Sequence, residues 1–179
     1  MTNMATLGGG CYWCLEAFYQ RLKGVDSVVS GYSGGHVDNP TVERVYKGDT
    51  GHAEVVQLTF DPKVISYEEI LEIFFVMHDP TTLNRQDYDV GDEYRSIILY
   101  HDEGQRKIAE ELKKTYAAGL WKNPIVTQIV PLETFWPSAD YMQNFYDRNP
   151  GNRYCEVIID PKIQKLRQKF AAKLKTAER

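Results

Sequence analysis

The residue best suited to chemistry in this sequence is Cys11, which directly follows the three glycines Gly8, Gly9 and Gly10. Glycines let the backbone turn sharply between an apolar segment and a helical pattern, and they leave room above the turn. The pattern places Cys11 in the first turn of a helix, where free amide groups and the helix dipole favour a thiolate. We therefore predict that Cys11 is a nucleophile. The alternative is an inert core cysteine, the commoner fate of this residue type.

Cys14 follows three residues later and forms a C-x-x-C pair with Cys11. Two interpretations stay open for it: a local redox pair, or a buried helical cysteine that does not react. A zinc site is a third interpretation, and its further ligands would be Cys155 and one of His36, His52, His78 and His101. The sequence has no second C-x-x-C and no H-x-x-x-H spacing, so no metal is expected.

Tyr12 and Trp13 are bulky aromatic residues beside the predicted nucleophile. Each is as well explained as an ordinary core residue. Together with a cysteine at a helix start, they would form an apolar substrate-binding pocket for a small group such as a methyl.

The surrounding elements alternate between strand and helix patterns. Strands are predicted over residues 5–7, 25–32, 55–60, 96–100 and 125–132, and helices over 12–22, 103–116, 139–146 and 162–175. Another helix starts at Ser66, with Glu69 completing a capping box, and stops before Pro80. Residues 36–52 and 79–95 are predicted loops, and the length of the second is typical of a functional loop. The pattern predicts an α+β fold: a two-layer sandwich with a mixed or antiparallel sheet, a ferredoxin-like βαβ core, and a C-terminal coil and helix.

The composition is typical of one globular catalytic domain over residues 1–179. The chain is 42% hydrophobic and carries a net charge of -4, which argues against a nucleic-acid partner. No secretory signal and no apolar run long enough for a membrane span are visible. An odd count of three cysteines is typical of a reducing compartment, so a cytoplasmic monomer is expected.

Several motifs occur in the order found in the A-type peptide methionine sulfoxide reductases, and the chain resembles that family from about residue 5 to residue 165. The first motif is Gly10-Cys11-Tyr12-Trp13 with Glu16 shortly after, where tyrosine replaces the family's usual phenylalanine. The others are residues 31–35 (Gly-Tyr-Ser-Gly-Gly), 39–41 (Asn-Pro-Thr), 50–54 (Thr-Gly-His-Ala-Glu), 78–86 (His-Asp-Pro-Thr-Thr-Leu-Asn-Arg-Gln) and 91–96 (Gly-Asp-Glu-Tyr-Arg-Ser).

The resemblance implies reduction of the S-epimer of methionine sulfoxide, free or in proteins, without a cofactor. Cys11 would attack the sulfoxide sulfur and keep the oxygen as a sulfenic acid. Glu54 matches the family's acid, which needs a raised pKa in an apolar pocket to donate a proton near neutral pH. On its own, Glu54 would equally be a solvated loop carboxylate.

Tyr94 and Asp89 match family residues that bind the sulfoxide oxygen and orient the substrate. A second family tyrosine is replaced here by Val42. Tyr46, four residues later, is the candidate substitute, and a plain surface tyrosine is the alternative. A family histidine is also missing from residues 139–143.

Cys155 matches the family's C-terminal resolving cysteine, on a segment whose Gly151 and Asn152 suggest mobility. The resemblance implies that Cys155 forms a disulfide with Cys11, which thioredoxin or a similar dithiol protein then reduces. Cys14 is the second candidate for this role. Two rival functions remain: a general thiol–disulfide oxidoreductase that uses Cys11 and Cys14, and a zinc-stabilised binding module.

Overall fold

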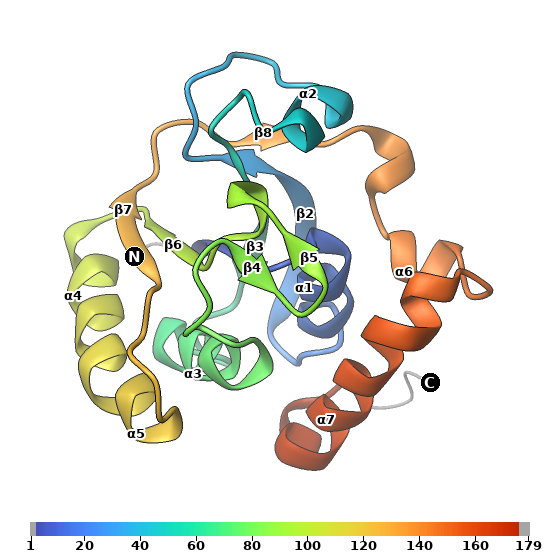
Figure 1. The fold of residues 1–179 in the computed structure, drawn as a ribbon. Coiled ribbons are helices and arrows are strands. Elements are labelled where there is room, and N and C mark those ends of the chain that lie inside the picture. Colours follow the sequence, from blue (N-terminus) through green and yellow to red (C-terminus); the bar gives the residue numbers. More distant parts are fainter. Residues whose placement is uncertain (1–2, 176–179) are drawn as a thin grey trace.

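A six-stranded sheet forms the centre of the molecule (Figure 1). The structure, a computed structural model, describes residues 3–175. Across the sheet the strands run in the order β7 (Gln128–Pro131), β6 (Ile97–Tyr100), β1 (Met4–Gly8), β3 (Ala53–Phe60), β2 (Val25–Ser33) and β8 (Trp136–Pro137). Only the β6–β7 pair is parallel among these neighbours, so the sheet is mixed.

The four inner strands have the ferredoxin-like arrangement of two interleaved βαβ units. Helix α1 (Tyr12–Tyr19) connects β1 to β2, and helix α3 (Tyr67–Met77) connects β3 to β6. Because β3 pairs with both β1 and β2, each crossover spans one intervening strand. The prediction of an α+β fold with a ferredoxin-like core and a mixed sheet is confirmed.

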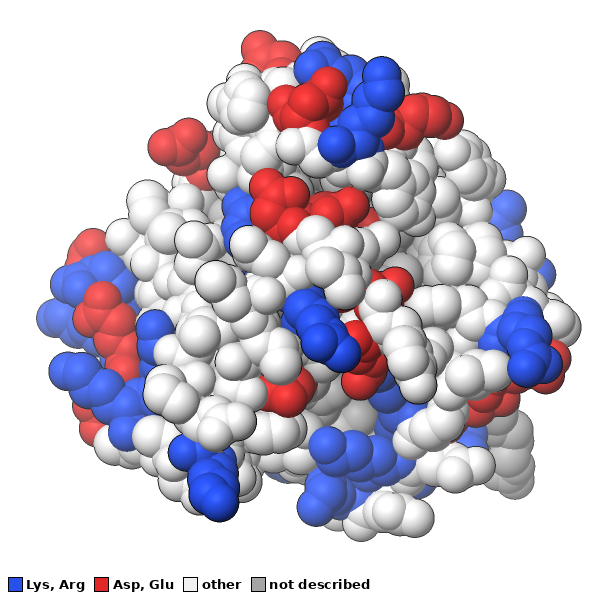
Figure 2. Space-filling view, in the orientation of Figure 1, with Lys and Arg blue, Asp and Glu red and all other residues white. Residues whose placement is uncertain are grey.

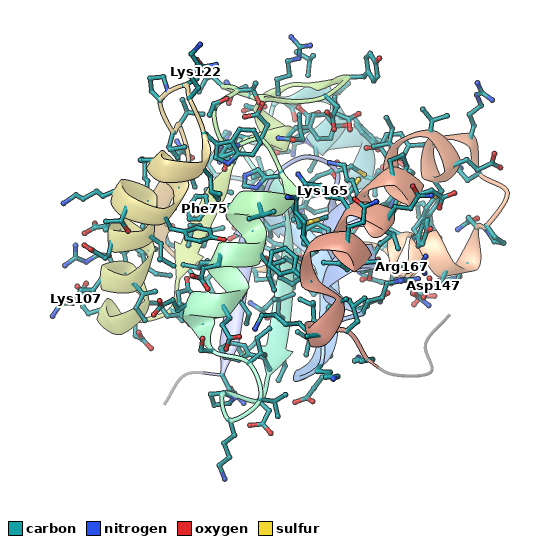
Figure 3. The ribbon with its side chains drawn as sticks, turned by 90° about the horizontal axis from the view of Figure 1, so that it is seen from below. Phe75, Lys107, Lys122, Asp147, Lys165 and Arg167 are labelled. Carbon is teal, nitrogen blue, oxygen red and sulfur yellow. The ribbon has the colours of Figure 1, made fainter. Side chains whose placement is uncertain are left out.

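Alternating side chains along the strands divide the core into two parts. Val56, Leu58 and Ile98 belong to the main core, which they share with α1, α3 and the C-terminal helix α7 (Asp160–Phe170). Val55 and Ile97 face the other way, into a smaller cluster covered by residues 130–135. Seen from below, α3 lies between α4 (Glu103–Leu112) and α7 (Figure 3).

Two local signals read from the sequence fix the start of α3. The Ser66 hydroxyl accepts a hydrogen bond from the Glu69 amide, and the Glu69 carboxylate accepts one from the Ser66 amide, which completes the predicted capping box. At the other end, the Nδ1 nitrogen of His78 lies 2.5 Å from the Phe74 carbonyl oxygen. The end of α3 therefore places the His78 ring against Gly9 in the glycine run.

Two of the predicted loops contain regular structure. Residues 36–52 include helix α2 (Val42–Lys47), which Thr41 caps and Gly48 ends with a left-handed backbone at φ 78°. Residues 79–95 include the hairpin of β4 (Arg85–Gln86) and β5 (Asp89–Val90), followed by the 3-10 turn η1 (Asp92–Tyr94). Both elements are too short to show a clear hydrophobic period, which explains why the sequence pattern missed them.

Other predicted boundaries shift. Helix α1 ends at Tyr19 rather than at residue 22, and the strand predicted over 125–132 is confined to β7. The helix predicted over 139–146 is divided into the 3-10 turn η3 (Asp140–Met142) and helix α6 (Phe145–Arg148), because Asn144 takes a left-handed backbone at φ 52°.

The segment that carries Cys155 is helical rather than an irregular coil. It forms the π-helical turn η4 (Cys155–Ile159), which continues directly into α7. Pro161 at the start of α7 lacks an amide donor and crowds the carbonyl four residues before it, and a widened turn relieves that conflict.

Helix α4 continues through the π-helical turn η2 (Lys113–Ala117) into the short helix α5 (Ala118–Leu120). Within residues 3–175, no helix combines the length and the apolar character needed to cross a bilayer. Acidic and basic side chains are interspersed over the face shown in Figure 2.

Candidate active site

Cys11 lies between the end of β1 and the start of α1, as the glycine pattern predicts. It is the N-cap residue of α1, and its side chain is 6% exposed. The preceding Gly10 has a left-handed φ of 89°, and its amide donates a hydrogen bond to the Tyr94 carbonyl at 3.1 Å. At Gly9, a Cβ atom would lie 2.7 Å from the His78 ring. The turn therefore requires glycine at both positions.

Glu54 reaches the same point from the neighbouring strand β3. Its Oε1 atom accepts a hydrogen bond of 3.0 Å from the Tyr12 amide, one of the free donors at the start of α1. The side chain is 2% exposed, and it interacts electrostatically with the Cys11 thiol. Cys11 and Glu54 thus form one buried pair, and Glu54 is not a solvated loop carboxylate.

Burial controls the protonation of this pair. It raises the pKa of the Glu54 carboxyl from 4.5 to about 8, and the charges of Asp89 and Glu93 add to the rise. Burial also raises the pKa of the Cys11 thiol well above its usual value, and a negative charge on Glu54 raises it further. A backbone hydrogen bond from Trp13 lowers the Cys11 pKa, as expected at a helix start, but it is the smaller effect.

Desolvation raises the pKa of the Cys11 thiol more than the helix start lowers it, because the sulfur lies in a closed site with a carboxyl beside it. The net direction of the Cys11 pKa is therefore opposite to the one expected from the helix end.

Tyr46, Asp89 and Tyr94 come from three separate elements, and each interacts electrostatically with this pair. The pKa of Tyr94 is raised first by burial and then by the charges of Glu54, Tyr46, Asp89 and Cys11, so all five groups interact. Burial and the charges of Glu54 and Cys11 raise the pKa of Tyr46 in the same way, although its side chain is 51% exposed. Both phenols are protonated at neutral pH and are able to donate hydrogen bonds.

Tyr46 lies on α2 four residues after Val42, so the two side chains share one helical face. Tyr46 therefore carries a phenol hydroxyl one turn along from the position where Val42 has none.

The two aromatic residues after Cys11 have different surroundings. Tyr12 is 1% exposed, and its hydroxyl lies 2.7 Å from the Tyr32 hydroxyl and 2.9 Å from the Ser138 hydroxyl. Trp13 is half-buried and stacks on Phe145, with ring centroids 3.6 Å apart. Trp13 thus lies nearer the surface, and Tyr12 supports the site from behind.

Tyr154 lies in the site, although no motif in the sequence indicates a role for it. Its hydroxyl donates a hydrogen bond of 2.6 Å to Asp89 Oδ2 and lies 3.7 Å from Cys14 Sγ. Its ring contacts Trp13 edge-on, with centroids 5.7 Å apart. The only available signal was an aromatic residue directly before Cys155.

Glu16, noted only as part of a motif, holds α1 to the C-terminal half of the chain. Its Oε2 atom accepts a hydrogen bond of 2.9 Å from the Asn144 amide. The side chain is 2% exposed, and burial raises its pKa to about 7. This contact fixes the segment that supplies Phe145 to the Trp13 stack.

All three cysteines are free thiols in this structure. Cys14 is buried one turn along α1 from Cys11. Cys155 is 1% exposed in η4, and its amide donates a hydrogen bond of 3.2 Å to Asn152 Oδ1. The pKa of Cys155 is raised by burial and by Asp160, a residue of the helix that follows.

Comparison with known proteins decides among the functions that the sequence left open. The family model described as "Peptide methionine sulfoxide reductase" matches residues 3–174. The chain belongs to this family. The reductase is 58% identical over 171 residues to peptide methionine sulfoxide reductase MsrA of Sulfolobus acidocaldarius, covering 96% of this chain and 97% of the relative. It is 58% identical to the MsrA of Saccharolobus solfataricus, covering 98% and 99%.

Solved structures agree with this assignment. Reduced Mxr1 from Saccharomyces cerevisiae matches the reductase with a TM-score of 0.78 and 34% identity, covering 85% of this chain and 88% of Mxr1. Mxr1 in complex with Trx2 matches with a TM-score of 0.55 and 28% identity, covering 79% and 83%. The prediction of a thiol-dependent methionine sulfoxide reductase is confirmed, and neither rival function is needed.

Proposed function

We propose that this reductase acts on the S-epimer of methionine sulfoxide, free and in proteins, with Cys11 as nucleophile and Glu54 as acid. The observation that carries the proposal is the buried pair that these two side chains form between β1 and β3. Burying a carboxyl beside a thiol costs folding free energy, so this pair does not serve stability. Such a cost is typical of residues that are retained for function.

The reaction balances within this pair. Glu54 donates its proton to the sulfoxide oxygen, which makes the sulfur electrophilic. The Cys11 sulfur attacks that sulfur as its own proton passes to the Glu54 carboxylate, and a sulfur–sulfur bond forms. The hydroxyl group then moves from the substrate sulfur to the Cys11 sulfur while the sulfur–sulfur bond breaks and its electron pair stays on the substrate. Cys11 is left as a sulfenic acid, and methionine leaves. Glu54 is protonated again at the end of the step.

The surrounding side chains supply orientation. Tyr94 and Tyr46 donate hydrogen bonds to the sulfoxide oxygen, and Asp89 accepts one from an N–H group of the substrate. Trp13 forms the apolar wall against which the S-methyl group lies, and the buried Tyr12 ring supports this wall from behind. A site with donors on one side and an aromatic wall on the other distinguishes the two epimers at sulfur.

We propose Cys155 as the thiol that resolves the sulfenic acid, releasing water and forming a disulfide with Cys11. Disulfide geometry requires the two Cα atoms to lie within about 7 Å. Cys155 is buried in turn η4 and is not bonded to Cys11 in this structure, so we propose that this turn opens to bring the two sulfurs together. Single π-helical turns are frequent at functional sites. Cys14 is the second candidate, although two cysteines on adjacent turns of one helix are poorly placed for bonding.

We propose that thioredoxin, or a similar dithiol protein, reduces this disulfide by exchange. Support comes from the relationship to Mxr1, which has been solved in complex with Trx2. We further propose that residues 1–179 act as one catalytic domain, as a monomer in the cytoplasm. An odd number of free thiols supports that compartment.

The test uses single cysteine-to-serine variants, the S-sulfoxide of N-acetylmethionine methylamide, and either thioredoxin or no reductant. Cys11→Ser should abolish reduction. Cys155→Ser should release one methionine per enzyme and then stop, because the sulfenic acid is not resolved. Cys14→Ser should sustain turnover. Turnover by Cys11→Ser would contradict the nucleophile assignment, and sustained turnover by Cys155→Ser would transfer the resolving role to Cys14.

A further inference from the structure

Tyr154 lies between the substrate-orienting carboxylate and the segment that carries Cys155. We propose that Tyr154 is a positioning residue that occupies Asp89 until substrate arrives, so that binding of methionine sulfoxide releases the Cys155 turn. This inference rests on the proposed function, because it assumes that Asp89 accepts a hydrogen bond from the substrate and that Cys155 resolves Cys11.

The Tyr154 hydroxyl has one proton, and its position shows where that proton goes. The hydroxyl donates to Asp89 Oδ2 over 2.6 Å. With its only proton used there, the hydroxyl is left as the acceptor toward Cys14 Sγ, 3.7 Å away. The resulting chain runs from Cys14 through Tyr154 to Asp89. A substrate N–H that donates to Asp89 competes directly with the Tyr154 hydroxyl.

The ring of Tyr154 strengthens this competition. It contacts Trp13 edge-on, and Trp13 is the residue that we assign to the apolar wall for the S-methyl group. Tyr154 thus contacts both Trp13, which the substrate side chain would use, and Asp89, which the substrate main chain would use. A substrate that binds both Trp13 and Asp89 therefore competes with Tyr154 for its two contacts.

Displacement of Tyr154 acts directly on Cys155, the next residue. Near Cys155, the Asn152 side chain accepts from the Cys155 amide, the Asn152 carbonyl accepts from the Glu156 amide, and the widened turn η4 follows. Loss of the hydrogen bond to Asp89 removes a link between this turn and the β4–β5 hairpin. The resolving thiol is therefore kept buried, at 1% exposure, while no sulfenic acid is present, and it becomes available once substrate is bound.

The experiment measures how fast N-ethylmaleimide labels Cys155, with peptide mass spectrometry to separate the cysteines. A Cys11→Ser background allows the substrate to bind without reacting. The S-sulfoxide of N-acetylmethionine methylamide should accelerate labelling of Cys155 about tenfold, the effect of losing one hydrogen bond to a charged group. The R-epimer and N-acetylmethionine methylamide are control ligands and should leave the rate unchanged.

Tyr154→Phe removes only the competing hydroxyl. In this variant, Cys155 should be labelled about tenfold faster without ligand, and the S-sulfoxide should add little. With the native cysteines restored, the same substitution should lower KM, because the binding-competent state no longer has to displace Tyr154. A matched control is Tyr146→Phe, which loses a hydrogen bond to Asp160 in the same part of the chain. That variant should keep the acceleration by substrate.

The inference is wrong if the S-sulfoxide leaves Cys155 labelling unchanged, or if the R-epimer accelerates it equally. It is also wrong if Tyr154→Phe behaves like Tyr146→Phe. Failure of the proposed function has a different signature, since the native enzyme would then not reduce the S-sulfoxide at all.

Discussion

Replacing Glu54 by glutamine should stabilise the protein while it impairs catalysis. Glutamine has the shape of the protonated carboxyl and keeps an oxygen to accept from the Tyr12 amide. The folded-state pKa of Glu54, about 8, lies above its usual value of 4.5. A raised carboxyl pKa means that the stability contributed by Glu54 is fully present below about pH 4.5 and is lost as the pH rises through about 8.

The size of the effect follows from these two values. Relative to the native protein, the variant should gain almost nothing at pH 4, about 3 kcal/mol at pH 7 and about 5 kcal/mol above pH 9. For a chain of this length, that is a rise in Tm of about 10 °C at pH 9. Loss of the acid should slow the first chemical step by about 10²- to 10⁴-fold.

Urea denaturation at pH 4.5, 7 and 9 measures the stability difference, and a single-turnover sulfoxide assay measures the first step. Glu111→Gln, on the exposed side of α4, controls for removal of one negative charge and should change stability by less than about 0.5 kcal/mol at each pH. A stability difference that does not grow with pH would refute the assignment of a raised Glu54 pKa. A normal rate of sulfenic acid formation would refute its role as acid.

Two further substitutions test the support around this pair. Gly9→Ala places a Cβ atom 2.7 Å from the His78 ring. The ring has little freedom to move because its Nε2 lies 2.7 Å from Ser96 Oγ. We therefore expect the free energy of unfolding, measured in urea, to fall by about 1–3 kcal/mol and turnover to be reduced. Native stability in that variant would contradict the claim that the turn requires glycine at position 9. Tyr12→Phe removes one hydroxyl from a buried set of three but leaves Tyr32 and Ser138 bonded to each other at 3.0 Å, so it should cost about 1 kcal/mol and change kcat/KM by less than about threefold. A large fall in kcat/KM would instead place that hydroxyl in the reaction.

The sequence predicted those parts of the fold that are encoded locally. The glycine run, the Ser66 capping box and the strands at residues 5–7 and 55–60 each carry their own signal, and each is present in the structure. Helix α2 and the β4–β5 hairpin were missed because short elements bury too few side chains to show a period. The helical turn at Cys155 was missed for another reason: Gly151 and Asn152 signal a loop, although Asn152 instead caps the turn.

The candidate site divides in the same way. Cys11 was found from its own neighbours, whereas Glu54, Asp89 and Tyr94 were found only through the family resemblance, because tertiary contacts bring them together. The Cys11 pKa shifts in the direction opposite to the expected one, because a helix start is visible in a sequence and burial beside a carboxyl is not. Tyr154 escaped notice because its partner Asp89 lies 65 positions away.

The two groups that we propose to react lie at the ends of β1 and β3, which pair in the middle of the sheet, whereas Tyr46, Asp89 and Tyr94 come from α2, β5 and η1, short elements outside the six-stranded sheet. Local opening in folded proteins costs least in loops and most in core strands. We therefore expect these short elements to adjust to substrates of different shape while the spacing between the Cys11 sulfur and the Glu54 carboxyl stays constant.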